Sequence, residues 1–291
     1  MTINIPALEE ELNKQNLPIK IISIHFYSSS LFPLYKCTAI SNGQQIQLAM
    51  KLIDNKIMAE SEAKSLQHLR SLNVRCPEPF ALIQQENYHG LLMSFVQHKA
   101  VNHTKIKLDL KQSLANLYSE PSSQFGYTNT NFVGTIEQSN QLYNSFFEFW
   151  WHSGIERMLL LCQKQGYLKD ISIAKLKSTI DASVKNLSLH QETPHLVHGD
   201  LWNGNILFSG DYAFLIDPSI AYSLPEQDFA MLELFGSPLD LTDYQSLRPG
   251  ISIDLLKQRI QFFQLYPLLV HVSLFGGSYI QSSRQLIKQL S

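Results

Sequence analysis

The spacing of apolar residues changes once along this chain of 291 residues, near residue 100, and this change restricts the fold more than any other feature. Before it, short runs rich in β-branched residues alternate with turn residues, which is typical of antiparallel strands. After it, apolar residues mostly recur every three or four positions, which is typical of helices. The sequence therefore predicts an α+β protein with a strand-rich N-terminal part and a mostly helical C-terminal part.

Five strands are predicted in the N-terminal part. Tyr35–Ile40 and Ile46–Ile53 flank Asn42-Gly43, and asparagine and glycine tolerate the positive φ of a tight hairpin turn. The other three strands are expected at residues 19–26, 80–84 and 91–96, with the polar residues 86–90 as the turn between the last two. We expect one antiparallel sheet, preceded by a short amphipathic helix near residues 5–12.

Helices are predicted where apolar residues recur at spacings of three and four. One follows the third strand, from Lys56 to Leu72, with an inward face of Ala59, Ala63, Leu66 and Leu69. The C-terminal part is expected to contain helices at residues 108–117, 142–161, 171–187, 228–235 and 255–275, with strands only around Ile206 and Phe214. We therefore expect two domains, an N-terminal nucleotide-binding lobe of residues 1–97 and a C-terminal catalytic and substrate-binding lobe of residues 98–291.

The composition bounds the class of partner. Lysine and arginine total 23 against 25 acidic residues, and the isoelectric point is about 6.5, so no basic field for nucleic acid or a membrane is implied. The three cysteines are widely spaced and include no C-x-x-C pair, which fits a reducing compartment. No basic leader with an apolar run is seen at the N-terminus. We expect a cytoplasmic protein without a nucleic-acid or membrane partner.

Three oxygen-bearing residues indicate phosphoryl-transfer chemistry. Asp200 is followed by Asn205 and, after a short strand and a turn, by Asp217. Such a reaction needs a base near the acceptor hydroxyl and cations on the phosphates, and Mg²⁺ prefers oxygen ligands. We interpret Asp200 as the base and Asn205 and Asp217 as ligands of Mg²⁺ beside ATP. The D-x-x-x-x-N spacing alone also suits a capped surface turn, so the flanking strands carry the interpretation.

Two further residues around this loop are interpreted as structural. His198 precedes Asp200 and is expected to be buried, bracing the loop. Asp228 stands at the head of a predicted helix, where its carboxylate can accept backbone N–H bonds from the helix N-terminus or from the adjacent loop. Neither residue is expected to contact substrate.

A lysine and a glutamate are expected to form an ion pair. Lys51 ends the alternating strand, and Glu62 lies on the following helix. Glu62 shares a helix face with Leu66 and Leu69, and a carboxylate is costly to bury there without a cation. Lys51 would then contact the α and β phosphates of ATP while Glu62 orients it. The alternative is a solvated surface glutamate, since Glu60 and Glu62 also suit an exposed edge.

The turn expected to cover the phosphates contains no glycine. Glycine lets backbone N–H groups approach phosphate oxygens closely, but the segment is Tyr27-Ser28-Ser29-Ser30-Leu31-Phe32, and the first glycine of the chain is Gly43. Phosphate contacts would then come from the hydroxyls of Ser28, Ser29 and Ser30. The adenine is expected against the backbone of Met93, Ser94, Phe95 and Val96.

The loop His198-Gly199-Asp200-Leu201-Trp202-Asn203-Gly204-Asn205 resembles that of the fructosamine kinase (ketosamine 3-kinase) family, a branch of the protein-kinase-like fold beside aminoglycoside and choline kinases. The similarity extends over nearly the whole chain and includes Asn131 to Thr135, Asp217-Pro218-Ser219 and Leu274-Phe275-Gly276-Gly277. Trp202 is the discriminating residue, because related kinases share the histidine, aspartate and asparagine. Its indole offers a flat face to a sugar; packing in the core is the alternative.

The resemblance implies a two-lobed protein-kinase-like fold and ATP-dependent phosphorylation of the 3-hydroxyl of a ketosamine. The substrate would be a ribulosamine or fructosamine adduct, free or on a protein lysine, and the phosphorylated product would decompose and free the amine. The role would be deglycation. Two alternatives stay open: a kinase for another small hydroxyl compound, such as an aminoglycoside or a choline-like alcohol, and a catalytically weak pseudokinase that only binds a ligand, because the phosphate loop lacks glycine.

Overall fold

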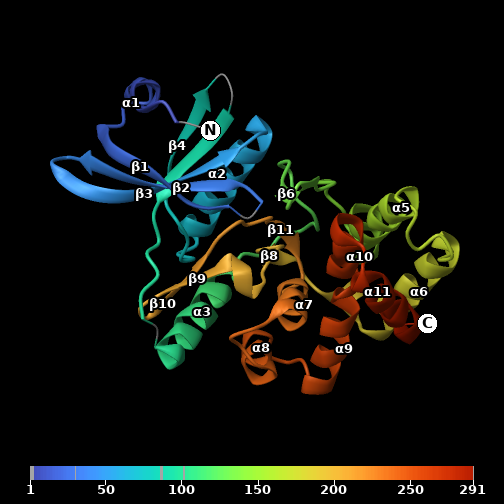
Figure 1. The fold of residues 1–291 in the computed structure, drawn as a ribbon. Helices are drawn as coiled ribbons and strands as arrows, with labels where there is room; N and C mark the ends of the chain where they lie inside the picture. The colour runs from blue at the N-terminus through green and yellow to red at the C-terminus, as the bar shows by residue number, and fades with distance from the viewer. Residues whose placement is uncertain (1–2, 30, 86–87, 101, 291) are drawn as a thin grey trace. The chain divides into compact units, whose positions relative to one another are not determined.

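The computed structural model describes residues 3–29, 31–85, 88–100 and 102–290 and is drawn in Figure 1. The chain forms two compact units that interleave along the sequence. The first contains the residues up to Leu110 together with Thr130–Ile136 and Ile206–Pro218. The second contains Lys111–Asn129, Glu137–Asn205 and the residues from Ser219 onward. The division into a nucleotide-binding lobe of residues 1–97 and a catalytic and substrate-binding lobe of residues 98–291 stays a prediction.

The first unit is built on the five-stranded antiparallel sheet that the sequence predicts. Its strands are β1 (Ile19–Ser29), β2 (Pro33–Ser41), β3 (Gln44–Ile53), β4 (Pro79–Gln85) and β5 (Tyr88–Ser94). They lie in the order β1-β2-β3-β5-β4. Asn42 and Gly43 join β2 to β3 with φ angles of 51° and 75°, so the predicted hairpin turn is confirmed.

The connection between β4 and β5 is shorter than predicted. Tyr88, His89 and Gly90 pair with β4 as part of β5, while Glu86 and Asn87 lie outside the described residues. Gly90 suits a crowded position in the strand, because a Cβ built on it would lie 3.4 Å from the Cβ of Ile83. Strand β5 also ends earlier than predicted, at Ser94.

Two helices and a hairpin complete the first unit. In α1 (Ile5–Lys14), Leu8 and Leu12 join the hydrophobic core of the sheet. In α2 (Lys56–Ser71), the predicted inward face is buried. Strands β9 (Ile206–Ser209) and β10 (Tyr212–Leu215) form the hairpin, and the Leu215 N–H donates to the Arg75 carbonyl at 2.8 Å.

The second unit is mostly helical, as predicted. Its elements are α4 (Phe146–Glu148), a π-helix (Phe149–Ile155), α5 (Glu156–Lys164), α6 (Ile173–Asn186), α7 (Glu226–Phe235), α8 (Leu241–Leu247), α9 (Ile253–Phe263), α10 (Leu265–Phe275), α11 (Ser278–Leu290) and short 3₁₀ turns at Leu189–Gln191 and Asn203–Asn205. Helix α3 (His103–Leu117) begins in the first unit and ends in the second. Among the described residues, no helix combines the length and apolar character needed to cross a bilayer.

Some elements differ from the prediction. The helix expected over residues 142–161 starts only after Ser145 and contains the π-helix, in which Gly154 packs against the ring of Tyr266. The helix expected over residues 255–275 divides at Gln264, because Pro267 has no N–H to donate to the carbonyl four residues earlier. Helices α8 and α11 and the short strand pairs β6 (Phe132–Val133) with β7 (Ile136–Glu137) and β8 (His195–Val197) with β11 (Ala221–Ser223) were not predicted.

A buried ion cluster in the second unit provides a test of stability. The side chains of Arg259 and Glu226 are 2% and 0% exposed and lie 3.2 Å apart. We predict that Arg259→Met lowers the free energy of unfolding by about 2–4 kcal/mol, because buried Glu226 loses one of its two cations and keeps Arg248, 3.2 Å away. Arg284→Met breaks only the exposed pair with Asp170 and should cost about 1 kcal/mol or less. Urea denaturation measures both values, and similar small losses would contradict the prediction.

Candidate active site

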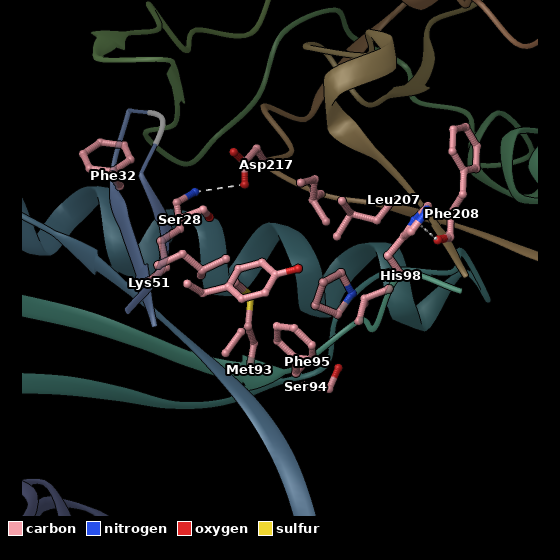
Figure 2. Close-up of a pocket in the computed structure, with 16 residues that line it drawn as sticks. Ser28, Phe32, Lys51, Met93, Ser94, Phe95, His98, Leu207, Phe208 and Asp217 are labelled. Atoms are coloured by element: carbon pink, nitrogen blue, oxygen red, sulfur yellow. Dashed lines mark hydrogen bonds and ion pairs between the residues drawn. The ribbon is translucent and has the colours of Figure 1, made fainter. Parts of the chain in front are cut away.

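The first unit contains a pocket lined by the sheet, by the segment after β5 and by the β9–β10 hairpin (Figure 2). The pocket encloses about 230 Å³. Apolar side chains form most of its walls, among them Leu34, Ala49, Met93, Leu207 and Ile216. Figure 2 shows Lys51 and Asp217 toward one end of the pocket and His98 toward the other. The pocket is therefore apolar along its length and charged at one end.

Two carboxylates hold Lys51 at the charged end. The Nζ atom of Lys51 lies 2.7 Å from Glu62 Oε2 and 2.9 Å from Asp217 Oδ1. The ion pair predicted between Lys51 and Glu62 is confirmed, and Asp217 is a second partner that the sequence did not connect to the lysine. The alternative of a solvated glutamate is wrong, because the Glu62 side chain is only 10% exposed.

The two carboxylates also determine the protonation state of the lysine. Burial by itself lowers the pKa of Lys51, but the charges of Glu62 and Asp217 outweigh burial and raise this pKa above its ordinary value. Burial raises the pKa of the Glu62 carboxyl, and Lys51 opposes that rise. Lys51 is therefore a cation at neutral pH, at the place where an anionic end of a ligand would meet the pocket.

Asp217 follows β10 in an unusual backbone conformation. Its φ angle is 54°, in the left-handed region, which aspartate adopts more readily than most residues other than glycine. The Asp217 side chain stays 42% exposed while one of its oxygens bonds to Lys51, so the carboxylate has room for a further ligand.

The segment after β5 offers backbone groups to the pocket. Met93, Ser94, Phe95 and Val96 all line it. The N–H groups of Ser94 and Phe95 already donate to the carbonyls of Glu78 and Gln47 at 2.8 and 3.2 Å. Within the described part of the chain, no hydrogen bond from the N–H of Val96 is found. Val96 is therefore the residue of this segment whose N–H can be donated to a ligand.

The glycine-free turn contributes Ser28 to the pocket, whereas Ser29 pairs with Pro33 at the end of the β1–β2 ladder. Ser30 lies outside the residues that the structure describes. Phe32 also lines the pocket, and the Nζ of Lys51 lies 5.5 Å from the centroid of its ring. This is within the range of a cation–π contact. No spacing or motif in the sequence predicted the contact between Phe32 and Lys51, because Lys51 lies on strand β3, at a distance from Phe32 in the sequence.

The second unit holds the loop from His198 to Asn205. The carboxylate of Asp228, fully buried on α7, accepts hydrogen bonds from the backbone N–H groups of His198 and Gly199 at 2.8 and 2.9 Å. The Tyr118 hydroxyl donates to the same carboxylate at 3.1 Å. Of the two roles predicted for Asp228, the bond to the adjacent loop is confirmed. Gly199 is required there, because its φ is 83° and a Cβ would lie 1.9 Å from the Ser219 carbonyl oxygen.

Asp200 and Asn205 are in contact on this loop. The Nδ2 atom of Asn205 donates to the Asp200 carbonyl oxygen at 2.8 Å and to Asp200 Oδ2 at 3.1 Å. Because the amide nitrogen faces Asp200, the amide oxygen of Asn205 is turned away from it, and such an oxygen suits Mg²⁺. Among the described residues, no group of three or more His, Cys, Asp or Glu side chains could hold a metal.

Trp202 is a surface residue of the same loop. Its side chain is 39% exposed, so the alternative of packing in the core is wrong. The indole lies against Gly204, where a Cβ would come within 2.2 Å of the ring. Its ring also makes an edge contact with Phe235, with centroids 6.5 Å apart. These two contacts hold the ring of Trp202 in place, two residues after Asp200.

A family model described as fructosamine kinase matches residues 35–291 of the chain. The chain belongs to the fructosamine kinase family. It is an ATP-dependent phosphotransferase. A protein of Enterococcus faecium described as a probable ketoamine kinase is 31% identical over 232 residues, which cover 79% of this chain and 81% of that protein.

Solved structures establish the fold of this fructosamine kinase family member. A structure described as a candidate fructosamine-3-kinase from Haemophilus somnus is similar with a TM-score of 0.82 and 19% identity, over 98% of this chain and 96% of that chain. The aminoglycoside phosphotransferase APH(4)-Ia is similar with a TM-score of 0.57 and 15% identity, over 99% and 98% of the two chains. The predicted kinase-like α+β fold is confirmed.

The Lys51–Glu62 pair of the kinase can be tested through stability. We predict that Lys51→Met lowers the free energy of unfolding by about 3–5 kcal/mol, because the Glu62 carboxylate is left buried without its cation. The double variant Lys51→Met/Glu62→Leu should recover most of this loss, since neither charge is then buried. Urea denaturation of the three proteins measures the effect. A double variant as unstable as the single one would show that the pair does not carry this energy.

The pH dependence of stability tests the environment of Asp228. Burial raises the pKa of Asp228 to about 6, against the hydrogen bonds from His198, Gly199 and Tyr118. The folded kinase then binds a proton at this residue more readily than the unfolded chain does, so the contribution of Asp228 to stability falls as pH rises from about 4 to 6. The difference in unfolding free energy between wild type and Asp228→Asn should decrease by up to about 3 kcal/mol over this window. A difference that is constant or grows with pH would contradict the raised pKa.

Proposed function

We propose that this kinase transfers the γ-phosphoryl group of ATP to the 3-hydroxyl of a ketosamine, a ribulosamine or fructosamine adduct on an amino acid or a protein lysine. The observation that carries the proposal is the pair of hydrogen bonds from Asn205 to Asp200 on a loop anchored by buried Asp228. A general base must keep its orientation while the acceptor hydroxyl approaches the phosphorus atom. The exposed indole of Trp202 on the same loop supports a sugar as the acceptor.

The nucleotide would occupy the pocket of the first unit. Its apolar walls suit a planar base, and the N–H and carbonyl of Val96 can form hydrogen bonds with the edge of adenine. Lys51 would meet the α and β phosphates, and Glu62 would keep the lysine oriented. Ser28 and the ring of Phe32 would cover the phosphates in place of a glycine-rich turn. The serines 29 and 30 stay predictions for the same role.

Asn205 in the second unit and Asp217 in the first are the proposed ligands of Mg²⁺, and each offers an oxygen donor. The amide oxygen of Asn205 is turned away from Asp200, and the Asp217 carboxylate keeps exposure while it bonds to Lys51. These are hard oxygen donors, which Mg²⁺ prefers. When bound, the ion would neutralise charge on the phosphate oxygens. The residues of the chain would provide the rest: Lys51 as a second cation, and Asp200 as the proton acceptor.

The transfer itself would proceed as an in-line displacement. The 3-hydroxyl oxygen of the ketosamine forms a bond to the γ-phosphorus, and the bond from this phosphorus to the β–γ bridging oxygen breaks, so that ADP leaves. The hydroxyl proton passes to the Asp200 carboxylate. The product, a ketosamine 3-phosphate, would then lose its amine, which gives the kinase a deglycation role. The three cysteines are free and buried, which suits the cytoplasm as the place of this reaction.

The role of Asp200 is tested by Asp200→Asn. Asparagine keeps the shape but cannot accept a proton, so we expect turnover to fall roughly 10²- to 10⁴-fold. Binding of ATP with Mg²⁺, measured by the shift in melting temperature, should be retained. Asp211→Asn is a matched control, because Asp211, in the β9–β10 turn, pairs with the exposed Lys105 of α3, and its turnover should stay unchanged. Unchanged turnover in Asp200→Asn would exclude Asp200 as the base.

The acceptor class is tested with a panel of ribulosyl-lysine, fructosyl-lysine, an aminoglycoside and choline. We expect ATP to be consumed with the two ketosamines, because Trp202 offers an aromatic face to a sugar. The Asp200→Asn protein serves as the blank for ATP hydrolysis. Preference for the aminoglycoside or for choline would contradict the proposed substrate.

A further inference from the structure

Five aromatic side chains of the second unit form a continuous row that begins at the catalytic loop. We refer to them as the aromatic row: Trp202, Phe235, His271, Phe275 and Tyr279. Phe235 contacts Trp202 at its edge and stacks on His271, with centroids 4.3 Å apart and planes at 21°. His271 in turn lies 5.5 Å from Phe275 and 4.9 Å from Tyr279. The rings come from the loop, the end of α7, α10 and the start of α11.

The two ends of the row are on the surface. Phe275 is 66% exposed and Trp202 is 39% exposed, whereas rings that only fill a core are buried. The backbone around the row is shaped by glycine: Gly236 follows Phe235, and Gly276 and Gly277 follow Phe275, all with positive φ. Helix α7 ends at Phe235, directly before Gly236, and helix α10 ends at Phe275, directly before Gly276. The rings of Phe235 and Phe275 therefore lie at helix ends.

Among the described residues, no lysine or arginine makes a cation–π contact with a ring of the row. The four cation–π contacts found among the described residues involve Phe95, Phe32, Tyr212 and Trp151, and none involves a ring of the row. His271 is also neutral at neutral pH, because burial lowers its pKa. Its Nδ1 atom donates a hydrogen bond to the Pro267 carbonyl at 2.8 Å. The faces of Phe235 and His271 cover each other, whereas the exposed rings of Phe275 and Trp202 can accept a cation from outside.

A ketosamine has the matching chemistry. Its nitrogen is a secondary alkylamine, which is protonated at neutral pH, and its carrier continues as a chain of methylene groups when the amine is a lysine. An acceptor whose sugar lies at Asp200 and Trp202 must extend this cation and chain away from the reacting hydroxyl. The aromatic row starts at Trp202 and offers the ring faces that such a group would follow.

We propose that the aromatic row is the specificity determinant for the amine side of the acceptor, where Phe275 and Tyr279 bind the protonated secondary amine and the methylene chain of its carrier. The inference rests on the proposed function. It goes beyond that function because it assigns recognition of the charge on the amine, and not only of the sugar, to named residues that lie outside the catalytic loop.

The experiment compares two acceptors that differ in one atom. The first is a ketosamine on the side-chain nitrogen of Nα-acetyllysine, and the second has an ether oxygen in place of that nitrogen and is therefore neutral. We expect wild type to have a lower KM for the amine. Phe275→Leu keeps an apolar side chain but removes the ring, and should raise the KM for the amine about two- to fivefold. Phe275→Leu/Tyr279→Leu should raise it about tenfold, with kcat unchanged and a much smaller rise in the KM for the ether, which shares only the methylene chain.

Tyr212→Leu is the matched control, because Tyr212 is an aromatic residue that is 48% exposed and belongs to the first unit. It should change neither KM. Melting temperatures of all variants show that they are folded. If wild type phosphorylates the amine but the double variant keeps its full preference, or loses affinity equally for both acceptors, the inference is overturned and the proposed function stands. If wild type phosphorylates neither acceptor, the proposed function is overturned and the inference with it.

Discussion

The buried lysine between two carboxylates is the interaction on which the pocket of the first unit depends. Lys51 is brought by a sheet strand, Glu62 by the following helix and Asp217 by the β9–β10 hairpin. Removing Lys51 leaves the buried Glu62 carboxylate without a cation, so the strand and the helix that carry this pair must fold together. The same cluster explains why a glutamate can be tolerated on an apolar helix face. The pocket of this family member is thus charged at one end and apolar along its walls.

In the second unit, hydrogen bonds hold the loop from His198 to Asn205 in place. Buried Asp228 accepts two backbone N–H groups of the loop, and Gly199 fits where a side chain would strike the Ser219 carbonyl. Asn205 then closes the loop by bonding to Asp200. Polar groups inside the protein orient the loop, while the Trp202 indole on the same loop remains on the surface. Under the proposed function, the anchored loop would position Asp200 as the proton acceptor, and the exposed ring of Trp202 would contact the sugar.

Features that depend on local spacing could be predicted from the sequence, and features that depend on distant partners could not. The hairpin at Asn42-Gly43 and the buried face of α2 follow from turn chemistry and from helical periodicity, and both are present. The Lys51–Glu62 pair could be predicted because the cost of burying a carboxylate demands a cation. By contrast, two features depend on contacts between residues far apart in the chain. These are the position of Phe32 beside Lys51, and the aromatic row. The π-helix and the division at Gln264 were missed for a related reason: apolar spacing is the same in one continuous helix and in two that abut.

The most direct test of the central claim is to identify the atom that receives the phosphoryl group. The kinase would be incubated with ATP, Mg²⁺ and fructosyl-lysine, and the product examined by correlated ³¹P and ¹H nuclear magnetic resonance. The account predicts a new phosphate ester whose phosphorus couples to the hydrogen on carbon 3 of the sugar, followed by release of lysine. A phosphate ester at another carbon, or consumption of ATP without any phosphorylated ketosamine, would contradict it.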